Sequence, residues 1–205
     1  GWEENNMKMF HAKGNICVGM TVLFFLCTLL GGCSGSREQT ASDDTDGFEE
    51  SVELNKHGDS IYRKEFGTYT VLDGWVESET HSTDEQFFYV KDGHDDDVSP
   101  DNISINEGTN RYGKDEYMQF KDAVMAQLLA QVGNQNVQVN GSGTYTANED
   151  PMILFEIIEE DGTVTRQYYI VGDYRYCLVH LTNYSGDEEA DRVAEIMADG
   201  FAWRE

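Results

Sequence analysis

The stretch that decides the fold is residues 152–184, MILFEIIEEDGTVTRQYYIVGDYRYCLVHLTNY. It contains three runs rich in apolar and aromatic residues, separated by Asp161-Gly162 and Gly172-Asp173, which are pairs typical of tight hairpin turns. The pattern therefore predicts three antiparallel strands over residues 152–158, 164–171 and 174–184. Because apolar side chains fall on both faces of these strands, the sheet needs cover on both sides.

The alternation within the last strand assigns its side chains to two faces. Cys177, Val179 and Leu181 should share one face, and Tyr176, Leu178 and His180 the other. Cys177 and His180 are the residue types of a nucleophile and its base. Their odd separation places them on opposite faces, so we expect a thiol in the core and a histidine on the sheet face.

Two segments with helical periodicity can supply the cover. In residues 115–132, apolar residues recur at three- and four-residue steps, and Gly133-Asn134 follows as a helix end. A second helix is predicted after Ser185, which with Glu188 forms a capping-box pattern. Its apolar stripe consists of Ala190, Val193, Met197 and Phe201.

The remaining strands are predicted on either side of the first helix. Residues 67–72 read as a strand that runs into a turn at Asp73-Gly74, residues 86–91 as the next strand, and residues 102–106 as a third. Residues 136–145 are polar and indicate an edge strand. The fold class is therefore α+β: an antiparallel sheet with two helices in a three-layer α/β/α sandwich, formed by residues 61–205.

This order of elements resembles the PsbP-like fold, in which a strand hairpin, a helix, a three-stranded meander and a C-terminal helix surround an antiparallel sheet. The residues that carry the resemblance are Gly67-Thr68-Tyr69 and Gly74-Trp75. Asp73 departs from the pattern, which has Pro at that position. The resemblance implies an accessory or binding domain, although a fold does not fix a function.

The N-terminal segment has the order of an export signal. Lys8 and Lys13 precede an apolar run over residues 16–30, which is shorter than the about 20 residues of a membrane span. The run ends in Leu30-Gly31-Gly32-Cys33, which resembles the lipobox of bacterial lipoproteins. The resemblance implies cleavage between Gly32 and Cys33 and lipidation of Cys33, with a plain secretory signal as the alternative.

Two further boundaries follow from composition. Residues 1–6 add Glu3 and Glu4 ahead of a region that should be basic, and Trp-Glu-Glu can be encoded by a purine-rich ribosome-binding sequence. We therefore expect translation to start at Met7. Residues 33–60 are acidic and poor in large apolar residues, which predicts a flexible tether after the lipidated cysteine.

The charge balance limits the partners. The chain has 14 Lys and Arg against 39 Asp and Glu, a formal net charge of −25. Such a surface repels nucleic acid and anionic headgroups. The partners that we expect are the membrane, reached through the lipid anchor, and another protein of the cell envelope.

The candidate metal site is the acidic loop at residues 92–101, which contains Asp95, Asp96 and Asp97. Calcium takes several carboxylate and carbonyl oxygens. The spacing matches no loop with a defined ligand order, so a solvated acidic turn is the alternative. We expect no cofactor.

The aromatic residues of the domain are either a ligand groove or core packing. They are Trp75, Tyr168, Tyr169, Tyr174, Tyr176, Tyr184 and Trp203. Without a catalytic motif, the sequence predicts a non-catalytic binding or accessory lipoprotein outside the cytoplasm. The alternatives are an envelope hydrolase with paired carboxylates and a calcium-dependent adhesion or scaffold module.

Overall fold

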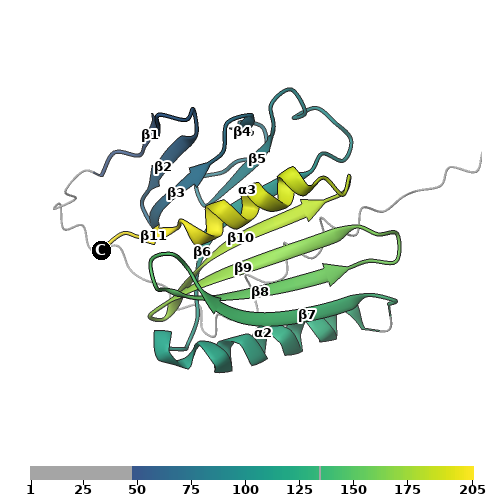
Figure 1. Cartoon of the computed structure of the whole chain (residues 1–205). Helices are drawn as coiled ribbons and strands as arrows, with labels where there is room; N and C mark the ends of the chain where they lie inside the picture. Colours follow the sequence, from purple (N-terminus) through teal and green to yellow (C-terminus); the bar gives the residue numbers. More distant parts are fainter. Residues whose placement is uncertain (1–47, 134) are drawn as a thin grey trace, which may run out of the picture.

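The main sheet has seven antiparallel strands in the order β4-β5-β6-β10-β9-β8-β7 (Figure 1). The computed structural model describes residues 48–133 and 135–205. The predicted meander of β8, β9 and β10 lies within this sheet, and β7 is an edge strand as expected. The strands are β4 Trp75–Glu77, β5 Gln86–Lys91, β6 Asn102–Thr109, β7 Gln138–Tyr145, β8 Pro151–Ile158, β9 Val164–Gly172 and β10 Arg175–Asn183.

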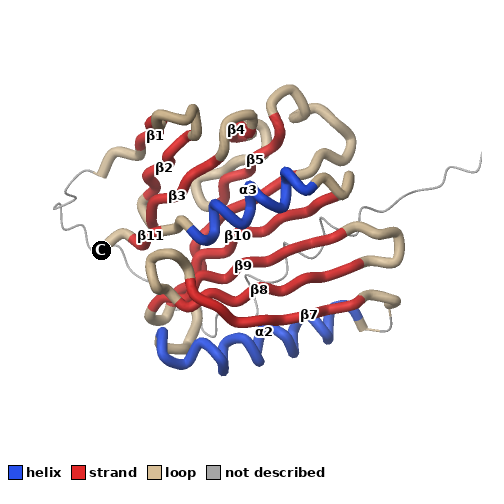
Figure 2. The backbone as a smooth tube through the Cα atoms, in the orientation of Figure 1, coloured by secondary structure: helices blue, strands red, loops and turns tan. Residues whose placement is uncertain are grey.

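The two predicted helices cover opposite faces of the main sheet (Figures 1 and 2). Helix α2, Tyr117–Val132, follows a 3-10 turn at Lys114–Glu116 and lies behind β7 and β8 in Figure 1. Helix α3, Glu188–Asp199, lies in front of β10. The α+β fold class, with an antiparallel sheet between two helices, is therefore confirmed.

A second, small sheet forms part of the front layer, and the single predicted sheet is wrong in this respect. It has the order β1-β2-β3-β11 and lies beside α3 (Figure 1). The bounds of its strands are β1 Ser51–Leu54, β2 Ser60–Lys64, β3 Gly67–Val71 and β11 Ala202–Trp203. The turn after β3 carries the chain from the small sheet into the main one. The alternation of apolar and polar residues does not show that the strands before and after this turn belong to different sheets.

The folded domain begins earlier than the predicted boundary at residue 61. Ser51–Leu54 pairs with β2, although these residues were assigned to the tether. Val52 and Leu54 alternate with polar residues but remain 54% and 74% exposed, so β1 is held by its pairing with β2 and buries no apolar face. Residues 1–47, with the signal segment, Cys33 and most of the tether, lie outside the described residues.

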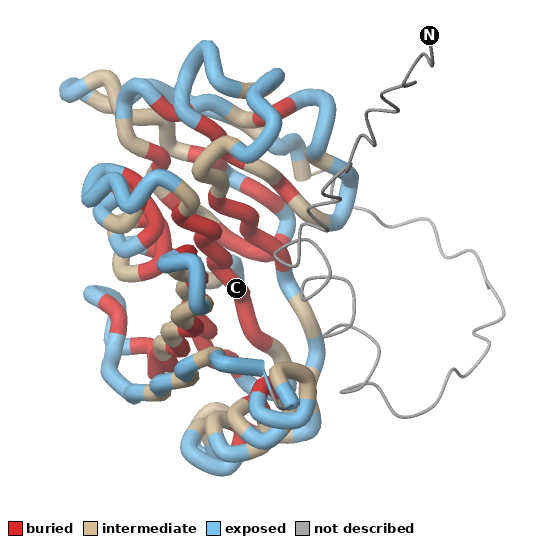
Figure 3. The backbone as a smooth tube through the Cα atoms, turned by 90° about the vertical axis from the view of Figure 1, so that its right-hand side faces the viewer, coloured by how far each residue is buried: buried red, intermediate tan, exposed pale blue. Residues whose placement is uncertain are grey.

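The side chains of the main sheet form two cores, one on each face. Figure 3 colours the backbone of the buried residues red. Cys177, Val179 and Leu181 pack in the front core with α3 and the small sheet. Tyr176 and Leu178 pack in the back core, as alternation predicted. Three residues of α2 complete the back core: Phe120, Val124 and Leu128. Each such buried side chain contributes about 1.5–3 kcal/mol relative to an exposed one.

Two local predictions are corrected at the ends of β10. The tight loop before it is Asp173-Tyr174, since Gly172 still pairs with Arg175 at the end of β9. The N-cap of α3 is Asp187, whose carboxylate accepts from the backbone N–H of Glu189, and not Ser185. The Ser185 hydroxyl donates instead to the carboxylate of Asp101 in the loop before β6.

Candidate functional site

The three predicted metal ligands, Asp95, Asp96 and Asp97, lie in the loop between β5 and β6. Asp97 is engaged with His94, whose Nδ1 is 2.7 Å from the Asp97 carboxylate. Within residues 48–133 and 135–205, no three His, Cys, Asp or Glu side chains are placed to share a metal ion. Asp95, Asp96 and Asp97 therefore do not converge on one point in the part of the chain that the structure describes.

The same loop borders a hollow of about 350 Å³ beside Trp75 and the start of α3. Lys91 lies on its rim, with Nζ 2.5 Å from the Glu189 carboxylate and 3.9 Å from that of Asp187. Asp101 accepts from the backbone N–H groups of Tyr184 and Ser185. These contacts join the loop to the start of α3. The charged groups that line this hollow are therefore largely paired within the protein.

Cys177 and His180 lie on opposite faces of the sheet, as strand alternation predicted. Cys177 lies in the front core, and burial raises the pKa of its thiol well above the ordinary value. His180 points to the opposite face, where burial lowers its pKa to about 4. Its Nε2 is 3.3 Å from the Thr182 hydroxyl. These two side chains cannot act together on one substrate.

The aromatic residues are mainly core. Trp75, Tyr168, Tyr169 and Tyr176 are buried, and the Tyr169 and Tyr176 rings lie 5.3 Å apart in the back core. Tyr174 is 64% exposed at the tight loop before β10. The predicted aromatic groove is therefore not formed as a unit, although Tyr168 contributes to a groove on the front face.

This front groove, of about 400 Å³, lies between α3 and the front of β7, β8 and β9. In Figure 1, α3 lies over β10, and β7 and β8 lie below it. Met152, Leu154 and Tyr168 are on the strands that line the groove, and Asp191, Glu195 and Asp199 are on α3.

Arg166 is the cation of the front groove. Its guanidinium donates to Glu156, with Nε 3.0 Å from the carboxylate, and also to Asp191. This is the converging carboxylate pair that a hydrolase would need. Both acids are engaged by one arginine, so neither is placed as a free acid or base.

The most distinctive surface of the domain is formed by α2 and β7 and contains almost no charged residues. Residues 117–147, which include α2 and β7, contain only Lys121 and Asp122 as charged residues, whereas 26% of the whole chain is charged. Large apolar residues are nonetheless exposed there: Met118 by 45%, Leu129 by 52% and Tyr145 by 56%. We call the exposed faces of α2 and β7 the uncharged surface.

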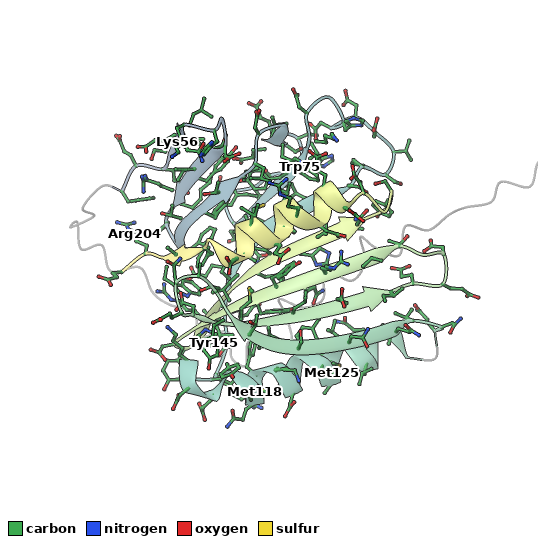
Figure 4. All side chains as sticks on the ribbon, viewed as in Figure 1. Lys56, Trp75, Met118, Met125, Tyr145 and Arg204 are labelled. Atoms are coloured by element: carbon green, nitrogen blue, oxygen red, sulfur yellow. The ribbon has the colours of Figure 1, made fainter. Side chains whose placement is uncertain are left out.

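Contacts between α2 and β7 make this surface continuous. The Tyr117 and Tyr145 rings pack edge to face at 6.0 Å, joining the start of the helix to the end of the strand. A Cβ at Gly141 would lie 2.7 Å from the Met125 methyl group, so glycine lets this side chain lie against the strand. Figure 4 shows Met118, Met125 and Tyr145 along the lower edge of the molecule.

The sequence predictions missed the uncharged surface, although it had a signal. Residues 115–132 were correctly predicted as a helix with one apolar face, which in the structure contains Phe120, Val124 and Leu128. The second set of apolar residues, Met118 and Leu129, lies outside that face. The signal that could have revealed this surface is the near absence of charged residues from α2 and the following strand in an otherwise acidic chain.

Neither described helix is long and apolar enough to span a membrane.

Comparison with known proteins bears on the fold alone. No family model matches the sequence, and no curated protein is significantly similar to it. One solved structure to which the chain is similar is the solution structure of cyanobacterial PsbP (CyanoP) from Synechocystis sp. PCC 6803. The identity is 10%, the coverage is 85% of this chain and 99% of that chain, and the TM-score is 0.43. At this level of similarity, nothing about function is taken from it.

Proposed function

We propose that this protein is a lipid-anchored, non-catalytic accessory protein outside the cytoplasm, which docks an envelope protein through the uncharged surface. The observation that carries the proposal is the coincidence of exposed Met118, Leu129 and Tyr145 with a surface almost free of charge. Interface cores are depleted in charged residues and enriched in Tyr and Met. Both properties are found here on adjacent elements.

The chemistry of the partner follows from the same surface. A largely apolar face is expected, because a charged group would lose its water against Met118 and Leu129. Helix α2 offers only Lys121 and Asp122 to pair with such a group. The 16 residues of α2 extend about 24 Å. The eight residues of β7 extend about 27 Å. An elongated patch of this kind suits the apolar stripe of an amphipathic helix.

Methionine and the two tyrosines suit this role in different ways. Met118 and Met125 are flexible and can adjust to the shape of a partner. Tyr117 and Tyr145 support each other at 6.0 Å and present a more rigid aromatic contact. The remainder of the chain carries nearly all of the negative charge, which discourages association through other faces.

A cross-linking experiment tests the docking surface. A photo-reactive amino acid is placed at Leu129, and as a control at Val98, an apolar residue that is 98% exposed in the acidic loop. In intact cells, we expect a discrete cross-linked species from position 129 and none from position 98. Equal cross-linking from both positions would contradict a specific docking surface, and a product of twice the chain's mass would identify a second copy as the occupant.

The anchor is tested separately. Lipidation at Cys33 is supported by the preceding Leu30-Gly31-Gly32 and by the apolar run before it. Cells fed an alkyne-bearing fatty acid should label the full chain, and Cys33→Ser should abolish the label and release the protein from membranes. Cys177→Ser is the control and should leave labelling unchanged, because Cys177 is buried in the front core. Labelling that survives Cys33→Ser would refute the anchor.

A further inference from the structure

We propose that the front groove binds a linear aliphatic amine, either a free polyamine or a lysine side chain of an extended peptide. The groove lies on the opposite face of the main sheet from α2. The two sites share Tyr145 and the edge strand β7, but the inference is carried by Tyr168 and by the carboxylates of α3, which have no part in the docking surface.

The side of the groove formed by the sheet suits a hydrocarbon chain. Met152, Leu154 and the Tyr168 ring contribute apolar surface from β8 and β9. Ser142 and Thr144 on β7 add hydroxyl groups that can accept hydrogen bonds from an ammonium group. Methylene groups laid against this surface would leave water, which favours binding.

The wall on α3 supplies negative charge at regular intervals. Asp191, Glu195 and Asp199 are four residues apart and thus lie on one side of the helix, about 6 Å apart along its axis. Asp191 is paired with Arg166. No Lys, Arg or His side chain of the described residues lies within ion-pair distance of Glu195 or Asp199. Two carboxylates are therefore left for a ligand's cations.

Tyr168 provides the second, independent observation. The residue is only 5% exposed, it lines the groove, and its hydroxyl makes no hydrogen bond to another described residue. Burial raises the pKa of this phenol to about 12, an effect that Arg166 opposes and Glu195 reinforces. The hydroxyl is thus neutral at physiological pH and can accept a hydrogen bond from an ammonium group that the carboxylates attract.

The arrangement selects against anions. Arg166 is the only cationic side chain among the residues that line the groove, and both Glu156 and Asp191 engage it. A carboxylate or phosphate ligand would have to displace one of them. An ammonium ligand would add to the pattern without breaking a contact.

Titration calorimetry of the full chain in detergent micelles tests the proposal. The two probes are spermidine and the blocked peptide acetyl-Val-Lys-Val-amide. We expect saturable binding of at least one probe at a single site per chain, weakened about tenfold by the double variant Glu195→Gln with Asp199→Asn. Tyr168→Phe should weaken binding while leaving the melting temperature nearly unchanged. Binding of spermidine alone assigns the groove to free polyamines, and binding of the peptide alone assigns it to lysine side chains.

The control separates this site from the general attraction of cations to an acidic protein. Glu188→Gln removes one negative charge from the same helix, as the single variant Glu195→Gln does, but outside the residues that line the groove. It should leave affinity and stoichiometry unchanged. Equal weakening by Glu188→Gln and Glu195→Gln, or no binding of either probe, would overturn the proposal. Either result would leave the docking of a partner on α2 unaffected.

Discussion

At the scale of single residues, the side-chain faces of β10 could be predicted because alternation in a strand is strict. Cys177 and His180 therefore lie on the expected sides. The helix cap could not be predicted in the same way. Ser185 and Asp187 are both good N-cap residues. The choice between them is made by Asp101, 84 residues before Ser185 in the chain, which accepts the serine hydroxyl.

His180 gives the domain a pH dependence whose sign follows from its burial. Its pKa is about 4 in the folded protein, compared with about 6.5 in the unfolded chain. Above pH 6.5 both states are neutral at this residue and stability is full. As the pH falls from 6.5 to 4, only the unfolded state gains the proton, so folding is disfavoured progressively.

We predict that this residue alone lowers the free energy of unfolding by about 3 kcal/mol between pH 7 and pH 4. His180→Phe removes the titrating group and keeps a ring at the position. Urea unfolding of both proteins at the two pH values isolates the effect, since the carboxylates titrate in both. Identical pH dependence of wild type and variant would show that His180 is protonated in the folded state as readily as in the unfolded chain.

At the scale of elements, prediction succeeded where periodicity was strong. Strand β5 has the predicted bounds of residues 86–91, and α2 ends at Val132 as predicted. Strands β1 and β11 were not predicted from the sequence, each for a different reason. The alternate residues Val52 and Leu54 of β1 both face solvent, and β11 is only two residues long. Strand β1 forms a local hairpin with β2, whereas β11 pairs with β3 from the other end of the domain, which is long-range information.

The pairing of β3 with β11 depends on Gly67. A Cβ there would lie 2.5 Å from the Phe201 ring and 2.6 Å from the backbone oxygen of Ala202. We predict that Gly67→Ala lowers the free energy of unfolding by about 1–3 kcal/mol, because both neighbours must move. Urea unfolding measures this change directly.

Gly143→Ala is the matched control in another strand. Its Cβ would lie 3.6 Å from the Tyr117 ring, an ordinary contact. It should be neutral or slightly stabilising, since alanine has less conformational freedom than glycine in the unfolded chain. A Gly67→Ala variant as stable as Gly143→Ala would mean that Phe201 and β11 do not pack against β3 as described.

At the scale of the whole molecule, the fold class could be predicted and the division into two sheets could not. The hairpin signals around residues 152–184 define the central meander, whereas the partners of β3 and β4 depend on how the chain turns at Asp73-Gly74. The front groove could not be predicted from the sequence either. It is formed by residues of β7, β8 and β9 with one side of α3, which lies over β10.

The uncharged surface could be predicted in part. The lack of charge in residues 117–147 is visible in the sequence, and helix and strand were both predicted there. Their assembly into one surface requires α2 to pack against β7, through Gly141 and the Tyr117–Tyr145 contact. A long uncharged segment in a chain of net charge −25 is thus a sign of an interface once its elements are known to be neighbours.

The most direct test of the docking claim is cross-linking from position 129 in cells that produce the Met118→Asp variant. A carboxylate at Met118 should remain solvated in the free protein, because this residue is 45% exposed, and should oppose an apolar partner. We predict that Met118→Asp abolishes the cross-linked species while the protein stays folded, and that Val98→Asp leaves the species unchanged. Undiminished cross-linking in the Met118→Asp variant would contradict docking through the uncharged surface.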